Sequence, residues 1–248
     1  MKHASLITGV LCIALSACGG GGGDSGPSAP SEAEGLWFGT TNTNRSIAGV
    51  VLDTGTYWFI YTSQGNNAVV AGAIQGTGST DNGSFSSSNG RDFNLEGQGI
   101  NNFTISGTYS SMQSLAGTIR YSATGEQVTF SSQYDSYYDE TPSLSIVAGN
   151  YSGTAATSAG TESANVVVSS NGAVSGQGAS GCTFTGSAAP RESGNVYDLS
   201  ITFGGGVCQN GGATVNGVAI YDPEFQQITS AALNSPRSDG FIFIGEKP

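Results

Sequence analysis

The side chains that most often perform chemistry are scarce in this sequence of 248 residues. His3 is its only histidine, and its two lysines are Lys2 and Lys247. Serine and cysteine hydrolysis need an imidazole base, many zinc sites use histidine ligands, and Schiff-base chemistry needs a lysine. No glycine-rich loop joins a strand to a helix, so dinucleotide and P-loop binding are also disfavoured. We expect no cofactor and no metal.

Carboxylates are the remaining candidates for catalysis, because glycosidases work with a pair of acids. Eighteen Asp and Glu are present, but most fall at turns or alternate outward from strands; Asp53, Asp81, Asp222 and Asp239 are turn residues. We therefore expect a protein that is not an enzyme. The alternative is a carboxylate-based glycan enzyme, which a pair of acids with raised pKa values deep in one barrel mouth would favour.

The N-terminal segment has the three parts of a secretory signal. Lys2 and His3 are followed by an apolar run from 6 to 15, which is too short to span a bilayer, and then by small residues. Leu15-Ser16-Ala17-Cys18 resembles the lipobox of bacterial lipoproteins. The resemblance implies cleavage of the signal peptide 1–17 and attachment of fatty acids such as palmitate at Cys18. An ordinary signal peptide with a chance cysteine is the alternative.

Residues 18–34 are rich in Gly, Ser and Pro and predict a flexible tether, about 22 Å in mean span for sixteen residues. Position 19 is Gly and not the aspartate that resembles an inner-membrane retention signal, which implies an outer-membrane location, on either its periplasmic or its exposed side. Cleavage removes Lys2 and leaves six basic against eighteen acidic side chains, a net charge of −12. Nucleic acid is therefore excluded as a partner.

With Cys12 in the signal and Cys18 lipidated, Cys182 and Cys208 remain. In an exported chain this pair predicts a disulfide, worth about 3–4 kcal/mol in the chain-entropy model. A reactive thiol or a metal pair is the alternative.

The body of the chain alternates apolar and polar residues with a period of two, as in 102–109, 115–121 and 197–203. Turn dipeptides such as Asn82-Gly83, Asn89-Gly90 and Asn171-Gly172 separate these runs. This pattern predicts an all-β, antiparallel meander.

An internal repeat divides the meander into two units. Gly35-Leu36-Trp37-Phe38-Gly39-Thr40 recurs as Gly149-Asn150-Tyr151-Ser152-Gly153-Thr154, and four further matches follow at nearly the same offset. We expect a first unit at 35–132, a connector at 133–148 and a second unit at 149–248. Each should hold about eight strands. The expected strands of the first unit are 35–40, 46–53, 56–62, 69–76, 91–96, 102–109, 115–121 and 127–132. Those of the second are 149–155, 162–168, 172–176, 181–187, 196–203, 213–221, 226–232 and 240–246.

Eight antiparallel strands favour an up-and-down barrel, because closure removes exposed sheet edges. The opening Gly35-Leu36-Trp37 resembles the Gly-x-Trp of lipocalins, in which the tryptophan plugs one end of the barrel. A two-sheet sandwich is the alternative for each unit. A membrane-spanning barrel is disfavoured, because its strands need about 9–11 residues and aromatic girdles.

Aromatic residues mark the candidate contact surfaces. In the run 56–61, Trp58 and Ile60 should lie on one face of a strand and Tyr57, Phe59 and Tyr61 on the other. One face should fill the barrel, while the other covers either the second unit or an external partner. The candidate ligand or partner contacts are Trp37, Tyr57, Trp58, Phe59, Tyr61, Tyr137 and Tyr138.

Acidic and aromatic residues also mark the connector. Asp135, Asp139 and Glu140 suggest a calcium site or a binding loop, but the carboxylates lack the dense alternation and glycine turn of such sites. We expect a solvated connector whose tyrosines pack between the units.

Taken together, the chain resembles the Gly/Ser-rich, two-repeat outer-membrane lipoproteins of proteobacteria, most of which have no assigned activity. The resemblance implies a non-enzymatic, lipid-anchored module that binds a protein at the cell envelope or surface. The alternative is a carrier that holds a small apolar ligand in the first barrel, where there is room for side chains or one small molecule.

Overall fold

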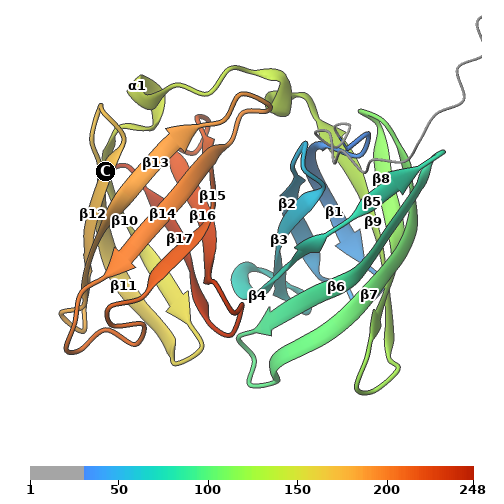
Figure 1. Ribbon diagram of the computed structural model, residues 1–248, viewed down its shortest axis with the longest axis horizontal. Coiled ribbons are helices and arrows are strands. Elements are labelled where there is room, and N and C mark those ends of the chain that lie inside the picture. Colours follow the sequence, from blue (N-terminus) through green and yellow to red (C-terminus); the bar gives the residue numbers. More distant parts are fainter. Residues whose placement is uncertain (1–30) are drawn as a thin grey trace, which may run out of the picture.

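The computed structural model describes residues 31–248, so the lipobox, Cys18 and the tether up to residue 30 lie outside the described residues. The described chain is all-β apart from two short helices between its halves (Figure 1). Each half closes into an antiparallel barrel, which confirms the expected architecture and excludes the sandwich alternative.

The first barrel contains eight long strands and one short additional strand. Neighbouring strands pair in the order β4-β3-β2-β1-β9-β8-β7-β6, and β4 pairs with β6 to complete the ring. The short strand β5 pairs with β6 alone. The strands are β1 (Gly35–Thr41), β2 (Ser46–Val51), β3 (Thr56–Ser63), β4 (Asn66–Thr77), β5 (Ser79–Asp81), β6 (Ser84–Asn94), β7 (Gly99–Ser110), β8 (Ser114–Tyr121) and β9 (Gln127–Asp135).

The largest difference from the expected strands lies in the serine-rich stretch before Arg91. It forms β5 and the first half of β6, although Asn89-Gly90 resembles a turn. The dipeptide instead lies at a register shift within β6, and the Asn89 side chain accepts a hydrogen bond from the backbone N–H of Thr77 at 2.8 Å. Phe85 is buried in the barrel core. Tertiary pairing therefore overrides a local turn signal here.

The second barrel is a ring of eight strands paired in chain order, with the last strand returning to the first. In β14 the residues Tyr197, Leu199, Ile201 and Phe203 are buried, which confirms the expected alternation. The strands are β10 (Gly149–Thr157), β11 (Gly160–Val168), β12 (Ala173–Gly178), β13 (Thr183–Pro190), β14 (Tyr197–Phe203), β15 (Thr214–Asp222), β16 (Gln227–Asn234) and β17 (Gly240–Glu246).

The two barrels are closed in the same way at one end. Trp37 is fully buried, and its indole N–H donates to the Ala33 carbonyl, four residues earlier, at 3.1 Å. Tyr151 occupies the equivalent position of β10, and its hydroxyl donates to the Val147 carbonyl, again four residues earlier, at 2.5 Å. The repeat seen in the sequence therefore preserves an interaction and not only a residue pattern.

Glycine is required at a second equivalent pair of positions. A Cβ at Gly39 would overlap the Ser131 carbonyl of β9, and one at Gly153 would overlap the Ile244 carbonyl of β17. In each barrel the pairing of the first and last strands thus leaves no room for a side chain at this glycine.

The barrels lie side by side and share an apolar contact (Figure 1). Trp58 of β3 belongs to a buried cluster that also contains side chains of the second barrel, among them Val218, Ala231 and Ile242. Arg191 of the second barrel forms an ion pair of 2.6 Å with Asp53 of the first barrel and another of 2.6 Å with Asp198 of its own barrel. Buried apolar surface and the Arg191–Asp53 ion pair hold the two halves together.

The segment between the barrels is shorter than expected, because β9 extends to Asp135. It consists of the 3-10 helix η1 (Ser136–Asp139) and the helix α1 (Leu144–Val147). The carboxylate of Asp135 accepts the backbone N–H of Tyr137, and that of Asp139 accepts the Tyr134 hydroxyl at 2.6 Å. These acids therefore stabilise the turn, and within residues 31–248 no group of three or more His, Cys, Asp or Glu could hold a metal ion.

Candidate functional site

The lumen of the first barrel contains a cavity of about 290 Å³. Trp37 and the segment 31–34 lie at the closed end, where β1 begins. The mouth lies at the other end and is formed by the turns β1–β2, β3–β4, β6–β7 and β8–β9. Exposed polar side chains such as Gln98, Thr124 and Glu126 line it, so the cavity reaches the surface at this end.

The deeper part of the lumen is apolar. Strands contribute every second residue to it, because successive side chains of a strand point to opposite faces. The side chains that form it include Phe59, Ile74, Ile105, Leu115, Ile119 and Phe130. A hydrocarbon or aromatic group would lose contact with water here without giving up hydrogen bonds.

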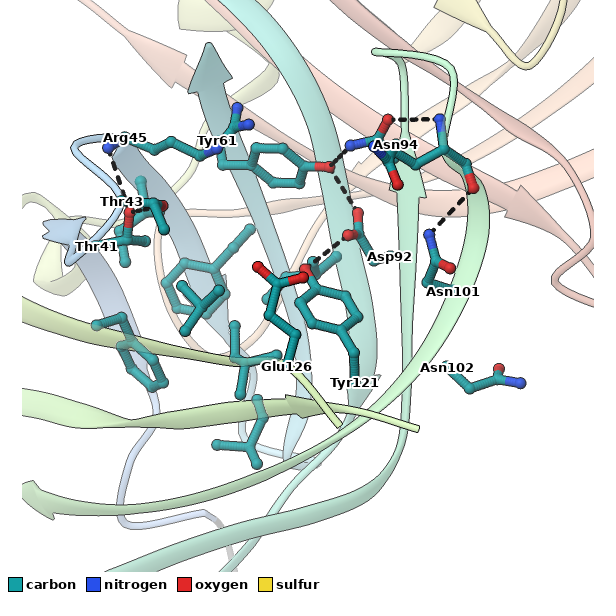
Figure 2. A pocket seen from close by; sticks show the side chains of 18 of the residues that line it. Thr41, Thr43, Arg45, Tyr61, Asp92, Asn94, Asn101, Asn102, Tyr121 and Glu126 are labelled. Atoms are coloured by element: carbon teal, nitrogen blue, oxygen red, sulfur yellow. Dashed lines mark hydrogen bonds between the residues drawn. The ribbon is translucent and has the colours of Figure 1, made fainter. Parts of the chain in front are cut away.

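One carboxylate, Asp92 of β6, lies buried below the mouth. Its side chain lines the cavity although the residue is only 3% exposed. The Tyr61 hydroxyl of β3 donates to its Oδ1 at 2.7 Å, and the Tyr121 hydroxyl of β8 donates to its Oδ2 at 2.8 Å (Figure 2). The Asn94 side chain donates in turn to the Tyr61 hydroxyl at 3.1 Å. Three strands thus meet at this carboxylate.

Burial determines how these groups titrate. Loss of water raises the pKa of Asp92, and the hydrogen bonds from Tyr61 and Tyr121 only partly oppose this rise. Burial and the neighbouring Asp92 carboxylate raise the pKa of both tyrosines. The tyrosines therefore stay protonated near neutral pH and act as hydrogen-bond donors.

A cation stands at the rim of the same mouth. Arg45 lies over the Tyr61 ring, 5.5 Å from its centroid, and its guanidinium pairs with Glu96 at 2.7 Å. A second N–H of Arg45 donates to the Thr62 carbonyl at 2.9 Å. The hydrogen bond from Arg45 lowers the pKa of Glu96, which holds that carboxylate in its charged form. The two rim charges therefore neutralise each other.

The second barrel has a cavity of similar volume, about 280 Å³. The predicted disulfide between Cys182 and Cys208 is confirmed, and it joins the loops β12–β13 and β14–β15 beside this cavity. The Glu162 carboxylate at the mouth accepts the backbone N–H of Ser180 at 2.6 Å. The lining of this cavity offers no buried carboxylate among the described residues, so the first lumen is the better candidate site.

The structure separates the seven aromatic candidates into two groups. Tyr57, Phe59 and Tyr61 line the first lumen, and Trp37 lies at its closed end. Burial raises the pKa of Tyr57 to about 12, and its hydroxyl lies 2.9 Å from that of Ser87. Tyr57, Phe59 and Tyr61 are available to a ligand in the barrel but not to a protein on its outer surface, whereas Trp37 does not line the cavity.

The second group lies between the barrels. Trp58 and Tyr138 are buried in the shared cluster, and Tyr137 packs against it. The outer face of β3 therefore covers the second unit, as expected, and Trp58, a candidate ligand contact, does not line the lumen cavity. Trp58 instead borders a separate cavity of about 400 Å³ between the barrels.

The sequence analysis missed Asp92, Tyr121 and Arg45. In the stretch 91–96, Asp92 alternates with Phe93 and Leu95, and this pattern suggests that the acid faces water. Phe93 and Leu95 in fact line the cavity between the barrels, so the acid faces the lumen. The signal available in the sequence was the pair Tyr61 and Tyr121 in the same unit. A buried tyrosine hydroxyl requires a hydrogen-bond partner, and a nearby acid such as Asp92 can supply it.

No protein-family model matches the chain, and no curated protein matches it in sequence. Among the described residues, no helix is long and apolar enough to cross a membrane.

Among solved structures, the chain is similar to a candidate outer membrane protein of Bacteroides fragilis NCTC 9343. The identity is 14% and the TM-score 0.28, over 88% of this chain and 100% of that one. Transferrin binding protein B of serogroup B Neisseria meningitidis matches at 11% identity and a TM-score of 0.31, over 83% and 66%. A tryptophan mutant of transferrin binding protein B from Haemophilus parasuis Hp5 matches at 10% identity and a TM-score of 0.29, over 82% of this chain and 60% of that one. At these scores the similarities carry no argument about function.

Proposed function

We propose that this chain is a lipid-anchored, non-enzymatic binding protein of the bacterial outer membrane, and that its first barrel binds a small ligand with an apolar body. The lipobox at Cys18 supports the anchor, and the absence of histidine beyond His3 supports a role without catalysis. The observation that carries the binding role is the first lumen. It is closed at the Trp37 end, apolar in its depth and polar at its mouth.

Binding in the lumen explains the placement of the aromatic side chains better than binding on the outer surface. Tyr57, Phe59 and Tyr61 face the cavity, and Trp58 and Tyr138 are buried between the barrels. A protein partner at the envelope remains a prediction, and these buried side chains do not supply its contact surface. The carrier role is therefore the better supported of the two.

The experiment is a binding screen with variants that fill the lumen. Ile105→Trp would add an indole where Ile105 now lines the cavity. Saturation-transfer NMR would test compact aryl and alkyl amines, alcohols and carboxylates, because a cavity of about 290 Å³ is at the small end of the range for ligand sites. We expect at least one compound to bind the wild type and to lose its signal with Ile105→Trp.

The matched control is Trp58→Phe, whose side chain faces the other barrel, and it should bind as the wild type does. Ile119→Phe is a smaller filling change at the same cavity, in case Ile105→Trp does not fold. The proposal is overturned if no compound binds the wild type, or if binding survives in a folded variant with a filled lumen.

A further inference from the structure

The first lumen contains a carboxylate with unused capacity for a cation. Asp92 is buried, and in the described part of the chain each of its side-chain oxygens accepts one hydrogen bond, from Tyr61 or from Tyr121. A carboxylate oxygen has two lone pairs, so both oxygens can accept a further donor. Asp92 forms no ion pair with any residue in 31–248.

The cation at the mouth does not meet this need. Arg45 is the one basic side chain among the described residues that line the cavity. Its guanidinium is engaged with Glu96 and the Thr62 carbonyl. Three carboxylates line the lumen, those of Asp92, Glu96 and Glu126, against the single guanidinium of Arg45. The mouth of the lumen, through which a ligand would enter, therefore carries a net negative charge.

A buried carboxylate without a paired cation is costly, because the attraction of a more distant charge, here Arg45, does not replace the water that it has lost. The rise in the pKa of Asp92 through burial has the same cause. Figure 2 shows Asp92 between Tyr61 and Tyr121, with Glu126 beside Tyr121. A ligand ammonium could donate to the free lone pairs of Asp92 and lie against these aromatic rings, which attract cations.

We propose that the ligand of the first barrel is a small primary amine, whose ammonium pairs with Asp92 and whose aryl or alkyl body fills the apolar depth around Ile105 and Leu115. This inference rests on the proposed function of the lumen as a ligand site. The cavity of about 290 Å³ is small for a ligand site, which favours a compact ligand such as an arylethylamine.

The test compares three probes with the same aromatic ring and different ends: 2-phenylethylamine, 2-phenylethanol and phenylacetate. Titration calorimetry of the full chain at neutral pH should give an affinity for the amine at least about tenfold higher than for the alcohol, as expected for a charge-assisted hydrogen bond. Phenylacetate should bind most weakly, because its charge repels Asp92 and Glu126.

Asp92→Asn should remove this preference by lowering the amine affinity about tenfold or more while leaving the alcohol affinity unchanged. Glu126→Gln removes a charge from the mouth and should cause a smaller loss. Glu224→Gln, in the exposed β15–β16 turn, removes the same charge away from the lumen and should have no effect.

The outcomes distinguish the two proposals. If none of the three probes binds and the wider screen is also negative, the lumen is not a ligand site and the proposed function fails. If the alcohol binds as tightly as the amine, or if a folded Asp92→Asn keeps the preference for the amine, the lumen remains a site but the amine inference is overturned. If Asp92→Asn does not fold, the wild-type order of affinities and Glu126→Gln decide.

Discussion

At the scale of single residues, Asp92 is the one charged side chain among the described residues that is buried. It accepts hydrogen bonds from the hydroxyls of Tyr61 and Tyr121, and the loss of water on burial disfavours its charged form. A structural role for this acid would be to tie β3, β6 and β8 together at the mouth. A role in binding would use its negative charge, and its titration is therefore informative in both cases.

The raised pKa of Asp92 predicts how stability depends on pH. The folded chain binds a proton at Asp92 more tightly than the unfolded chain, whose ordinary pKa is 3.8. The free energy of unfolding of the wild type should therefore increase relative to Asp92→Asn as the pH falls through the folded pKa, and this gain should be complete below about 3.8. Urea unfolding of both proteins between pH 7 and pH 3.5 measures the difference.

Glu96 supplies a contrast of opposite sign. Its pKa is lowered by Arg45, so its contribution to stability is present above its ordinary value of 4.5 and is lost as the pH falls through the lower folded pKa. The free energy of unfolding of the wild type minus that of Glu96→Gln should thus decrease in acid. The same quantity measured against Asp92→Asn should increase. A difference for Asp92→Asn that does not change with pH would contradict the environment described for Asp92.

At the scale of elements, the strands of both barrels follow one plan. The first strand of each begins with Gly-x-aromatic, and the aromatic group, Trp37 or Tyr151, bonds to a carbonyl four residues earlier. Two residues later, Gly39 or Gly153 allows the first strand to approach the last. The repeat is thus maintained at the positions where each ring closes.

Gly39→Ala should destabilise the first barrel, because the added methyl group would overlap the Ser131 carbonyl of β9. We expect a loss of roughly 1–3 kcal/mol, as for other overpacking changes, measured by urea unfolding followed by tryptophan fluorescence. The neighbouring side chain of Phe38 is 46% exposed, so Phe38→Ala should change stability by no more than about 0.5 kcal/mol. An unchanged midpoint for Gly39→Ala would mean that β1 and β9 can separate without cost.

At the scale of the whole molecule, both lumen mouths open at the same end, where the turns β6–β7 and β10–β11 lie together (Figure 1). In the first barrel the mouth is formed by turns such as β1–β2 and β6–β7, and in the second by β10–β11 and β12–β13. The described chain starts at the opposite, closed end, where Ser31 donates its backbone N–H to the Asp53 carbonyl at 2.7 Å. A chain anchored through its N-terminus would therefore be attached at the end away from both mouths.

The anchor itself is tested by Cys18→Ser. Loss of the thiol removes the site of acylation, so the chain should move from the membrane to the soluble fraction when cells are fractionated. Cys12→Ser is the matched control, because Cys12 lies within the expected signal peptide, and it should leave the chain in the membrane fraction. Membrane association of Cys18→Ser equal to that of the wild type would contradict lipid anchoring.

The sequence alone determined the class of the fold. Alternation with a period of two placed nearly every strand, because one face of each strand is dry and the other wet in an isolated barrel. The offset between the two Gly-x-aromatic openings showed that there are two units, and the count of cysteines gave the disulfide between Cys182 and Cys208. These inferences depend on local pattern and composition, which the sequence contains directly.

Only the tertiary structure decided which face of β3 and β6 points into the lumen. The second barrel packs against the outer surface of these strands and shields it from water. Trp58, Phe93 and Leu95 therefore point outward and remain largely covered. In the second half of β6 the polar face, with Asp92, then lies inside, where alternation would place an apolar residue, while the inward face of β3 stays aromatic. Contact between the units thus reverses the usual relation between polarity and direction in β6, and this contact is formed by residues far apart in the chain.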